Sequence, residues 1–357
     1  YVEQGDSVYL FPTGDPSFLH RDFKKQPVID FLKRQQKPVA ITSSNWQSAP
    51  LGFGWSWDDY NSSYMAERSP LPVYGNVIRF VQTQTPNEVN GKDEPVIFTE
   101  PDINWKLNFN PDPSTKVFSV RRQKAENIFR VTTGTEKYRE IDIPFVTNGL
   151  QSAIELLKDT VSQELIITDR KPLTSSRSLS GQPRTLYSQP TDSLLIPLMH
   201  NSDNFFAEQT LLMVSQLRLG TMNDDRIIDT LLNTDLKDLP QKPRWVDGSG
   251  LSRYNLFSPQ DFVWVLNRMK TEFPFERLKK IFPTGGQGTL RNYYKADSTH
   301  FFAKTGSLSG HLALSGYLTT RKNKLLIFSV IVNNHNGSAT AIRRQVERFL
   351  QGIARKY

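Results

Sequence analysis

The stretch His300–Asn333 decides the fold of the second half of the chain and reads HFFAKTGSLSGHLALSGYLTTRKNKLLIFSVIVN. It holds three apolar runs separated by short polar turns, and such runs are typical of β-strands. The runs are His300–Thr305, Leu312–Thr319 and Leu325–Asn333. Because turns this short join antiparallel neighbours, we expect an antiparallel meander, followed by a closing helix over Ala339–Ile353.

Helices are predicted upstream of this meander. Ser258 is a capping residue that is followed by a proline and, three positions on, by an acidic residue, so Phe262–Met269 should be helical. Asn204–Leu219 is a long amphipathic stretch, and Leu194–Met199 should form a helix that Pro197 interrupts or bends. The predicted fold class is α/β (α+β), with an antiparallel sheet flanked by helices.

The first half, up to about Thr191, is predicted to be mostly β, because short alternating runs are separated by Gly, Pro, Asn and Asp turns. The expected strands are Asp6–Pro12, Val77–Thr83, Val117–Arg121, Asn127–Thr132 and Leu165–Ile167, and the expected helices are Val28–Arg34 and Gly149–Lys158. The basic, polar stretch Ser175–Pro190 is the best connection between domains. We therefore divide the chain into a β-rich part, residues 1–186, and a second part, residues 187–357.

Composition limits the classes of protein to consider. A chain of 357 residues exceeds what one core usually organises. Apolar residues make up 37% of it and no apolar run reaches the roughly 18 residues that a membrane span needs. The net charge of +8 is scattered, without a nucleic-acid-binding signature. It favours solubility, or a weak attraction to an anionic polymer such as a cell-wall component.

Cysteine and histidine usage excludes several catalytic classes. The chain has no cysteine, so disulfides, thiol catalysis and cysteine-bound metals are excluded. Its five histidines show no metal-ligand spacing such as HExxH. A Ser-His-Asp triad of His200 with Ser202 is not expected, because i, i+2 neighbours on a helix do not face each other. No metal or organic cofactor is implied.

Two tripeptides carry the chemistry: Ser202-Asp203-Asn204 at an expected helix start and Lys304-Thr305-Gly306 at an expected strand end. Each is a weak signal alone. Their order, their spacing of about 100 residues and their predicted contexts matter more.

These residue types suit a serine nucleophile that is activated without histidine. Ser202 would relay a proton to the leaving amine, and Asn204 would donate its amide to a substrate carbonyl. Lys304 would supply positive potential for an anionic substrate terminus, which Thr305 would bond directly. The strand would bind an extended peptide as an added strand, and the Ser307 amide would be one oxyanion donor.

Ordinary structural roles explain the same residues. Ser202 and Asn204 are good helix caps, and Lys304 could be a solvated charge at a sheet edge. Gly248 and Gly250 could simply form a turn.

A family resemblance decides between these interpretations. Asp247-Gly248-Ser249-Gly250-Leu251-Ser252-Arg253 and Ser202-Asp203-Asn204-Phe205-Phe206-Ala207-Glu208 resemble segments of the class C low-molecular-mass penicillin-binding proteins, and Lys304–Gly310 is similar to that family's third motif. Gly14–Phe18 and Gly54–Tyr60 resemble two of its earlier elements. The segments occur in the family's order and cover nearly the whole chain.

The resemblance implies a penicillin-binding/β-lactamase-like transpeptidase domain with β-rich inserted domains, and a serine-type D-alanyl-D-alanine carboxypeptidase or endopeptidase. Its substrates would be peptidoglycan stem peptides outside the cytoplasm, and β-lactams would inhibit it covalently. The implied catalytic residues are Ser202, Asn204 and Lys304. The implied substrate-binding residues are Thr305, Gly306, Ser307, Ser249, Gly250, Leu251, Arg253, Trp55, Trp57, Asp58 and Asp59.

For the last four residues the sequence leaves alternatives open. Trp55 and Trp57 alternate as on a strand and could be core residues. Asp58 and Asp59 could be solvated acids in a turn.

One family element is missing: no serine in residues 1–357 has a lysine three positions on. Ser114-Thr115-Lys116 is one residue short. Because the sequence opens on Tyr1 instead of methionine, we expect an upstream segment that carries Ser-x-x-Lys and a signal peptide. The alternatives are a cell-wall peptide-binding relative without turnover, or a β-lactamase-like esterase.

Overall fold

The computed structural model describes residues 1–86, 93–110, 116–169 and 183–357. They form two compact units: unit 1 holds Tyr1–Gln189 and Glu208–Ile227, and unit 2 holds Pro190–Ala207 and Ile228–Tyr357. Part of the expected inter-domain stretch, residues 175–182, lies outside the described residues, as does most of Ser114-Thr115-Lys116. The division of the chain into two parts by role stays a prediction.

The meander predicted from the sequence is confirmed in unit 2. Its strands are β11 (Phe301–Leu308), β12 (His311–Thr319) and β13 (Leu325–Val332), hydrogen-bonded antiparallel in that order. β11 pairs in register Lys304↔Ser315, and β12 pairs in register Gly316↔Phe328. The first strand continues three residues beyond its predicted end, so the expectation that Lys304–Gly306 ends a strand was wrong.

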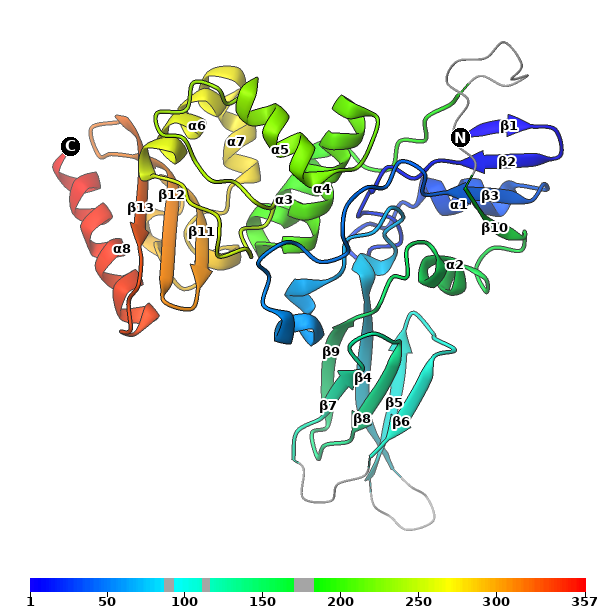
Figure 1. Ribbon diagram of the computed structural model, residues 1–357. Helices are drawn as coiled ribbons and strands as arrows, with labels where there is room; N and C mark the ends of the chain where they lie inside the picture. The colour runs from blue at the N-terminus through cyan, green and yellow to red at the C-terminus, as the bar shows by residue number, and fades with distance from the viewer. Residues whose placement is uncertain (87–92, 111–115, 170–182) are drawn as a thin grey trace. The chain divides into compact units, whose positions relative to one another are not determined.

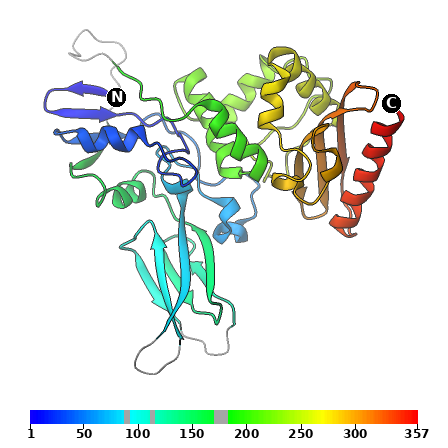
Figure 2. The same cartoon turned by 180° about the vertical axis from the view of Figure 1, so that it is seen from behind.

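The two faces of this sheet are covered by different helices. On one face Phe301, Ala303 and Leu314 pack with Leu350 and Ala354 of the closing helix α8 (Ala339–Lys356). The opposite face carries Phe302 and Tyr317, which pack with residues of three other helices. These are α3 (Thr191–Asn201), α6 (Pro259–Glu272) and α7 (Phe275–Ile281). Figures 1 and 2 show α8 running beside the sheet.

Local sequence explains where the helices of unit 2 begin. Ser258 and Asp261 form a reciprocal capping box at the start of α6, as predicted. Pro197 lies inside α3, which continues through it. α7 was not predicted, because a helix of seven residues after Pro274 has too few turns for a clear apolar period.

Two helices contribute residues to both units. They are α4 (Asn204–Leu219) and α5 (Asp224–Asn233). α4 was predicted with the same bounds, whereas α5 was not predicted.

Unit 1 is rich in strands, as the sequence predicted (Figure 1). Its four-stranded sheet has the order β1 (Val2–Gln4), β2 (Ser7–Leu10), β3 (Val39–Thr42), β10 (Leu165–Thr168), with parallel pairing of β3 to both neighbours. The other two sheets have the orders β5 (Asp93–Glu100), β4 (Val77–Pro86), β9 (Tyr138–Pro144), and β6 (Lys106–Phe109), β8 (Ile128–Thr132), β7 (Ser119–Arg122).

One apolar core joins these sheets and the helices α1 (Pro27–Arg34) and α2 (Gln151–Leu157). Leu32 of α1 and Leu157 of α2 are fully buried in it, together with Phe80 and Phe129 of the small sheets. Shared burial in this core therefore holds unit 1 together.

Candidate active site

Ser202 lies in the short junction between α3 and α4. It follows the last residue of α3 in a left-handed backbone conformation, with φ 57° and ψ 48°. Asp203 then caps α4, because its Oδ1 accepts a hydrogen bond from the Phe206 amide at 2.9 Å. The N-cap of α4 is therefore Asp203 instead of Ser202 or Asn204, whereas Ser202 is the C-cap of α3. Asn204 begins α4, two residues after Ser202.

The side chain of Lys304 reaches this junction. Its Nζ donates hydrogen bonds to Ser202 Oγ at 2.5 Å and to its own neighbour's carbonyl, Thr305 O, at 2.8 Å. Burial lowers the pKa of Lys304 from 10.5 to about 8, because an ammonium loses hydration there. The interpretation of Lys304 as a solvated edge charge is therefore wrong, and the structure brings two of the three predicted catalytic side chains together.

The outer edge of β11 exposes backbone groups beside this pair. Lys304 and Gly306 face β12 in the ladder, so the amides and carbonyls of Thr305 and Ser307 point the other way. The backbone amide of Ala303 points to the same side as those of Thr305 and Ser307 and donates a hydrogen bond to Pro283 O at 3.0 Å. From Lys304 to the end of β11, no strand in the described ranges pairs with this outer edge. This edge offers the geometry that an added peptide strand requires.

Thr305 has a partner that the sequence did not reveal. Its hydroxyl donates to Thr289 Oγ1 at 2.8 Å, and Thr289 lies in a short 3-10 helix, η4 (Gly288–Leu290). Gly288 has φ +48°, and a Cβ there would lie 2.4 Å from the carbonyl oxygen of His200 in α3. The glycines before Thr289 were the only available signal, since such a cluster marks close backbone approach.

A cavity of about 740 Å³ extends from this edge of the sheet toward α8. Thr289, Thr305 and Ser307 line it, together with Arg343 of α8. Arg343 Nη2 donates to Ser307 Oγ at 2.7 Å. Three hydroxyls and a guanidinium form a surface suited to a carboxylate. Arg343 was missed because an arginine on an amphipathic helix is ordinarily a solvated residue.

The 247–255 loop is organised around a buried carboxylate. Asp247 Oδ1 accepts from the Gly250 amide at 2.8 Å, and its Oδ2 accepts from the Ser252 amide at 2.6 Å. Gly250 has φ +83°, so the turn interpretation of this glycine is supported.

The predicted binding residues lie along this loop. The Ser249 hydroxyl accepts from the Leu251 amide at 3.2 Å, and the exposed Arg253 reaches Ser309 O at 3.4 Å, just beyond β11. The loop is thus fixed in shape, and substrate contact by its residues stays a prediction.

The remaining predicted residues lie in unit 1, in the segment 52–61, which we call the acidic aromatic segment. Trp57 begins a 3-10 helix, η1 (Trp57–Asn61), and is 69% exposed, so its interpretation as a core residue was wrong. Lys124 Nζ lies 4.7 Å from the centre of its ring. Asp58 is exposed and Asp59 is half-buried. A hydrogen bond from Ser56 Oγ at 2.7 Å lowers the pKa of Asp58.

The described residues show neither a metal centre nor a membrane span. No three His, Asp or Glu side chains gather in the described ranges as metal ligands would. No helix in those ranges combines the length and the apolar character that crossing a bilayer requires.

Comparison with known proteins identifies the family to which the chain belongs. Residues 2–353 match the model of the D-Ala-D-Ala carboxypeptidase 3 (S13) family. The chain is 24% identical over 374 residues to the D-alanyl-D-alanine carboxypeptidase DacB of Haemophilus influenzae, covering 93% of this chain and 72% of that protein. It is 31% identical over 159 residues to the carboxypeptidase DacB of Mycolicibacterium smegmatis, covering 41% of this chain and 34% of that protein.

The fold is also found in solved structures. The crystal structure of penicillin binding protein 4 (dacB) from Haemophilus influenzae aligns with a TM-score of 0.72 at 18% identity, covering 98% of this chain and 82% of that one. The structure of that protein in complex with a β-lactam aligns with a TM-score of 0.66 at 17% identity, covering 99% and 84%. The predicted fold class is thereby confirmed. The chain belongs to the D-Ala-D-Ala carboxypeptidase 3 (S13) family, which confirms its resemblance to the class C low-molecular-mass penicillin-binding proteins.

Proposed function

We propose that this protein is a serine-type D-Ala-D-Ala carboxypeptidase or endopeptidase that acts on peptidoglycan stem peptides through an acyl-enzyme. The observation that supports this most directly is the contact of Lys304 Nζ with Ser202 Oγ at 2.5 Å. A lysine whose pKa lies near 8 can exchange a proton with a hydroxyl at ordinary pH. Family membership supplies the reaction class for this pair.

The chemistry proceeds in two steps. A serine oxygen gives up its proton to a neighbouring base and attacks the carbonyl carbon of the penultimate D-alanine. The C–N bond breaks, the leaving amine takes a proton from Ser202, Lys304 replaces that proton, and the proton given up by the attacking serine restores Lys304. Water then attacks the ester, which releases the shortened peptide as its carboxylic acid and restores the serine. Lys304 supplies positive charge and the proton for Ser202 through the observed hydrogen bond. The attacking serine belongs to a Ser-x-x-Lys element that we place outside residues 1–357.

Other residues bind the substrate. The Ser307 amide is one of the oxyanion donors, since it points outward from the edge of β11. The hydroxyl of Thr305, with Thr289 beside it, receives the terminal carboxylate. Asn204 donates to a peptide carbonyl.

We further propose that the stem side chain is recognised separately. Arg253 and the 249–251 turn contact the stem, and Trp55, Trp57, Asp58 and Asp59 receive a cationic side chain. The substrate places the enzyme in the periplasm or another extracytoplasmic space, and β-lactams act as covalent inhibitors because they mimic the scissile peptide.

Labelling with a fluorescent penicillin tests the proposal. The full-length protein should form a covalent adduct that survives denaturing gel electrophoresis, because the acyl-enzyme is an ester. A peptide ending in D-Ala-D-Ala should then release free D-alanine. A protein that binds the peptide but is never labelled would instead be a binder without turnover. Rapid turnover of nitrocefin would make it a β-lactamase-like esterase.

A further inference from the structure

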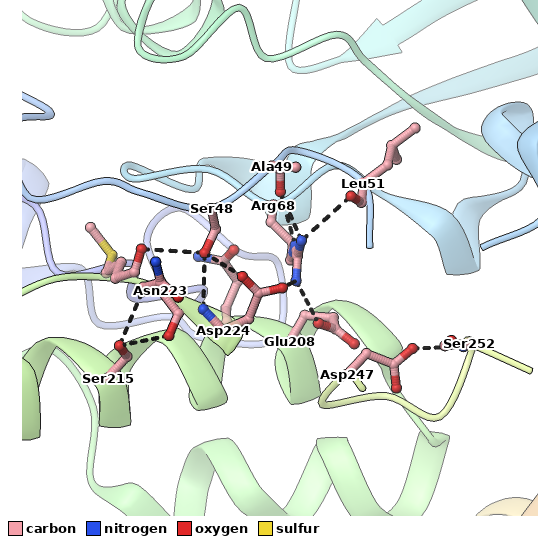
Figure 3. A network of polar contacts seen from close by, with 12 residues as sticks. Ser48, Ala49, Leu51, Arg68, Glu208, Ser215, Asn223, Asp224, Asp247 and Ser252 are labelled. Carbon is pink, nitrogen blue, oxygen red and sulfur yellow. Dashed lines mark hydrogen bonds and ion pairs between the residues drawn. The ribbon is translucent and has the colours of Figure 1, made fainter. Parts of the chain in front are cut away.

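Arg68 is the centre of a buried ionic cluster in unit 1 (Figure 3). Its side chain is 1% exposed. Its Nη1 donates to Asp224 Oδ2 at 2.7 Å and to Glu208 Oε2 at 3.3 Å. Glu208 is also 1% exposed and Asp224 14%. Ser48 donates its hydroxyl to the second oxygen of Asp224 at 2.8 Å. One guanidinium thus bonds carboxylates from two helices, α4 and α5.

The other nitrogens of Arg68 hold a segment without regular structure. Nε and Nη2 donate to the Ala49 carbonyl at 3.1 and 2.9 Å, and Nη2 also donates to Leu51 O at 3.4 Å. The Arg68 amide donates to Pro50 O at 2.8 Å. Only an arginine can serve carboxylates and carbonyls at once in this way, since its planar fork carries five N–H donors.

The same guanidinium fixes the start of the acidic aromatic segment. It lies 5.6 Å from the centre of the Trp55 ring. This ring also lies against Gly52, where an added Cβ would lie 2.4 Å from the indole nitrogen. Trp55 therefore packs against the Arg68 guanidinium, and the absence of a side chain at Gly52 leaves room for its ring. Asp58 follows it by three residues.

The end of the segment is fastened independently. Asn61 exchanges hydrogen bonds with β7, from its Nδ2 to Val120 O at 3.1 Å and from the Arg122 amide to its Oδ1 at 2.8 Å. The ring of Tyr60 lies under the Arg122 guanidinium at 5.4 Å. The acids therefore lie between two fixed ends, one of which depends on Arg68.

We propose that Arg68 is a positioning residue for substrate selection. It contacts no reacting atom and acts by holding the acidic aromatic segment so that Asp58 and Asp59 meet a cationic stem side chain. This inference rests on the proposed function. Lysine at position 68 keeps the positive charge but cannot bridge both carboxylates and the Ala49 and Leu51 carbonyls, so the segment loosens while the cluster keeps a buried cation.

The test uses full-length protein and two stem peptides ending in D-Ala-D-Ala. One peptide has a free amine on its diamino acid and the other has that amine acetylated. The measured quantity is the ratio of kcat/KM for the two peptides, together with the rate of labelling by a penicillin that lacks the amine. The variants are Arg68→Lys and, as a reference for lost recognition, Asp58→Asn combined with Asp59→Asn.

Arg79→Lys is the matched control. Arg79 also bonds two carboxylates in unit 1, Glu140 at 2.9 Å and Asp142 at 3.0 Å, but no described contact links it to the acidic aromatic segment. A general loss of stability would affect both arginine variants.

We expect Arg68→Lys to reduce the preference for the free amine by about tenfold, toward the value of the double acid variant, because small misplacements of binding groups are costly. Penicillin labelling should stay close to that of the parent, and Arg79→Lys should keep the preference. A folded Arg68→Lys protein with the parent's preference would overturn the inference, as would a parent that is labelled but shows no preference. A parent that is never labelled contradicts the proposed function itself.

Discussion

Lys304 and Arg68 are both cations with buried side chains, but their partners differ. In unit 2 Lys304 donates to a serine hydroxyl and a carbonyl, and burial alone lowers its pKa to about 8. In unit 1 Arg68 is paired with Glu208 and Asp224. A buried lysine among neutral partners can give up its proton, whereas an arginine between carboxylates keeps its charge. The environment of Lys304 suits proton transfer, whereas the environment of Arg68 suits a permanent ion pair that stabilises the fold.

The largest expected effect concerns the structural cation. Arg68→Met should lower the free energy of unfolding by about 3–5 kcal/mol, because it removes the buried cation that Glu208 and Asp224 share. Denaturant unfolding followed by circular dichroism measures this. Arg21→Met is the control, because Arg21 pairs with Asp142 at the surface and is 52% exposed. There we expect a change within about 1 kcal/mol. Equal losses in the two variants would show that the buried pairing of Arg68 stabilises the fold no more than a surface ion pair does.

The chemical cation should show the opposite pattern. Lys304→Ala should slow acylation by a fluorescent penicillin by about 10²-fold or more, because positive charge beside an oxyanion site is hard to replace. Its thermal stability should change little or increase, since a costly buried charge is removed. The control is Lys322→Ala, an exposed lysine in the β12–β13 turn. Normal acylation by the Lys304 variant would contradict its proposed role.

The pH dependence sharpens the comparison further. If the ammonium form of Lys304 is the active one, the second-order rate constant of acylation should fall by about tenfold per pH unit above its pKa of about 8. The stability of the folded protein should instead increase as the pH rises. Between about 8 and 10.5 the unfolded chain binds more protons at this lysine, so the lysine's contribution to the free energy of unfolding rises with pH.

The matching measurement is a pair of pH profiles, one of acylation and one of thermal unfolding, for the parent and for Lys304→Ala. Both transitions should disappear in the variant. A parent rate that rises above pH 8 would make the neutral amine the active form.

Much of the local structure of unit 2 could be predicted from the sequence. The apolar runs of the meander and the capping box before α6 are local signals, and both were confirmed. The end of β11 was misplaced because Gly306 and Ser307 are weak strand formers in isolation. Pairing with Ala313 and Leu312 overrides that preference.

The site was only partly predictable for a related reason. Ser202 and Lys304 were found through motifs, but the burial that lowers the pKa of Lys304 depends on helices far away in the sequence. Arg68 and Glu208 are separated by 140 residues, and neither carries a local signal of its partner. Thr289 and Arg343 were missed for the same reason. The motif residues could be predicted from the sequence, whereas their burial and their partners from distant parts of the chain could not.

The left-handed backbone at Ser202 sets two selective pressures against each other. A φ of 57° is costly for a residue with a Cβ, and glycine or asparagine would occupy the position more cheaply. Glycine, however, would remove the hydroxyl that Lys304 contacts. In a library screened only for heat resistance, position 202 should therefore drift toward glycine or asparagine, and screening for turnover should return serine. The serine at the junction between α3 and α4 therefore supplies the hydroxyl at the expense of backbone stability.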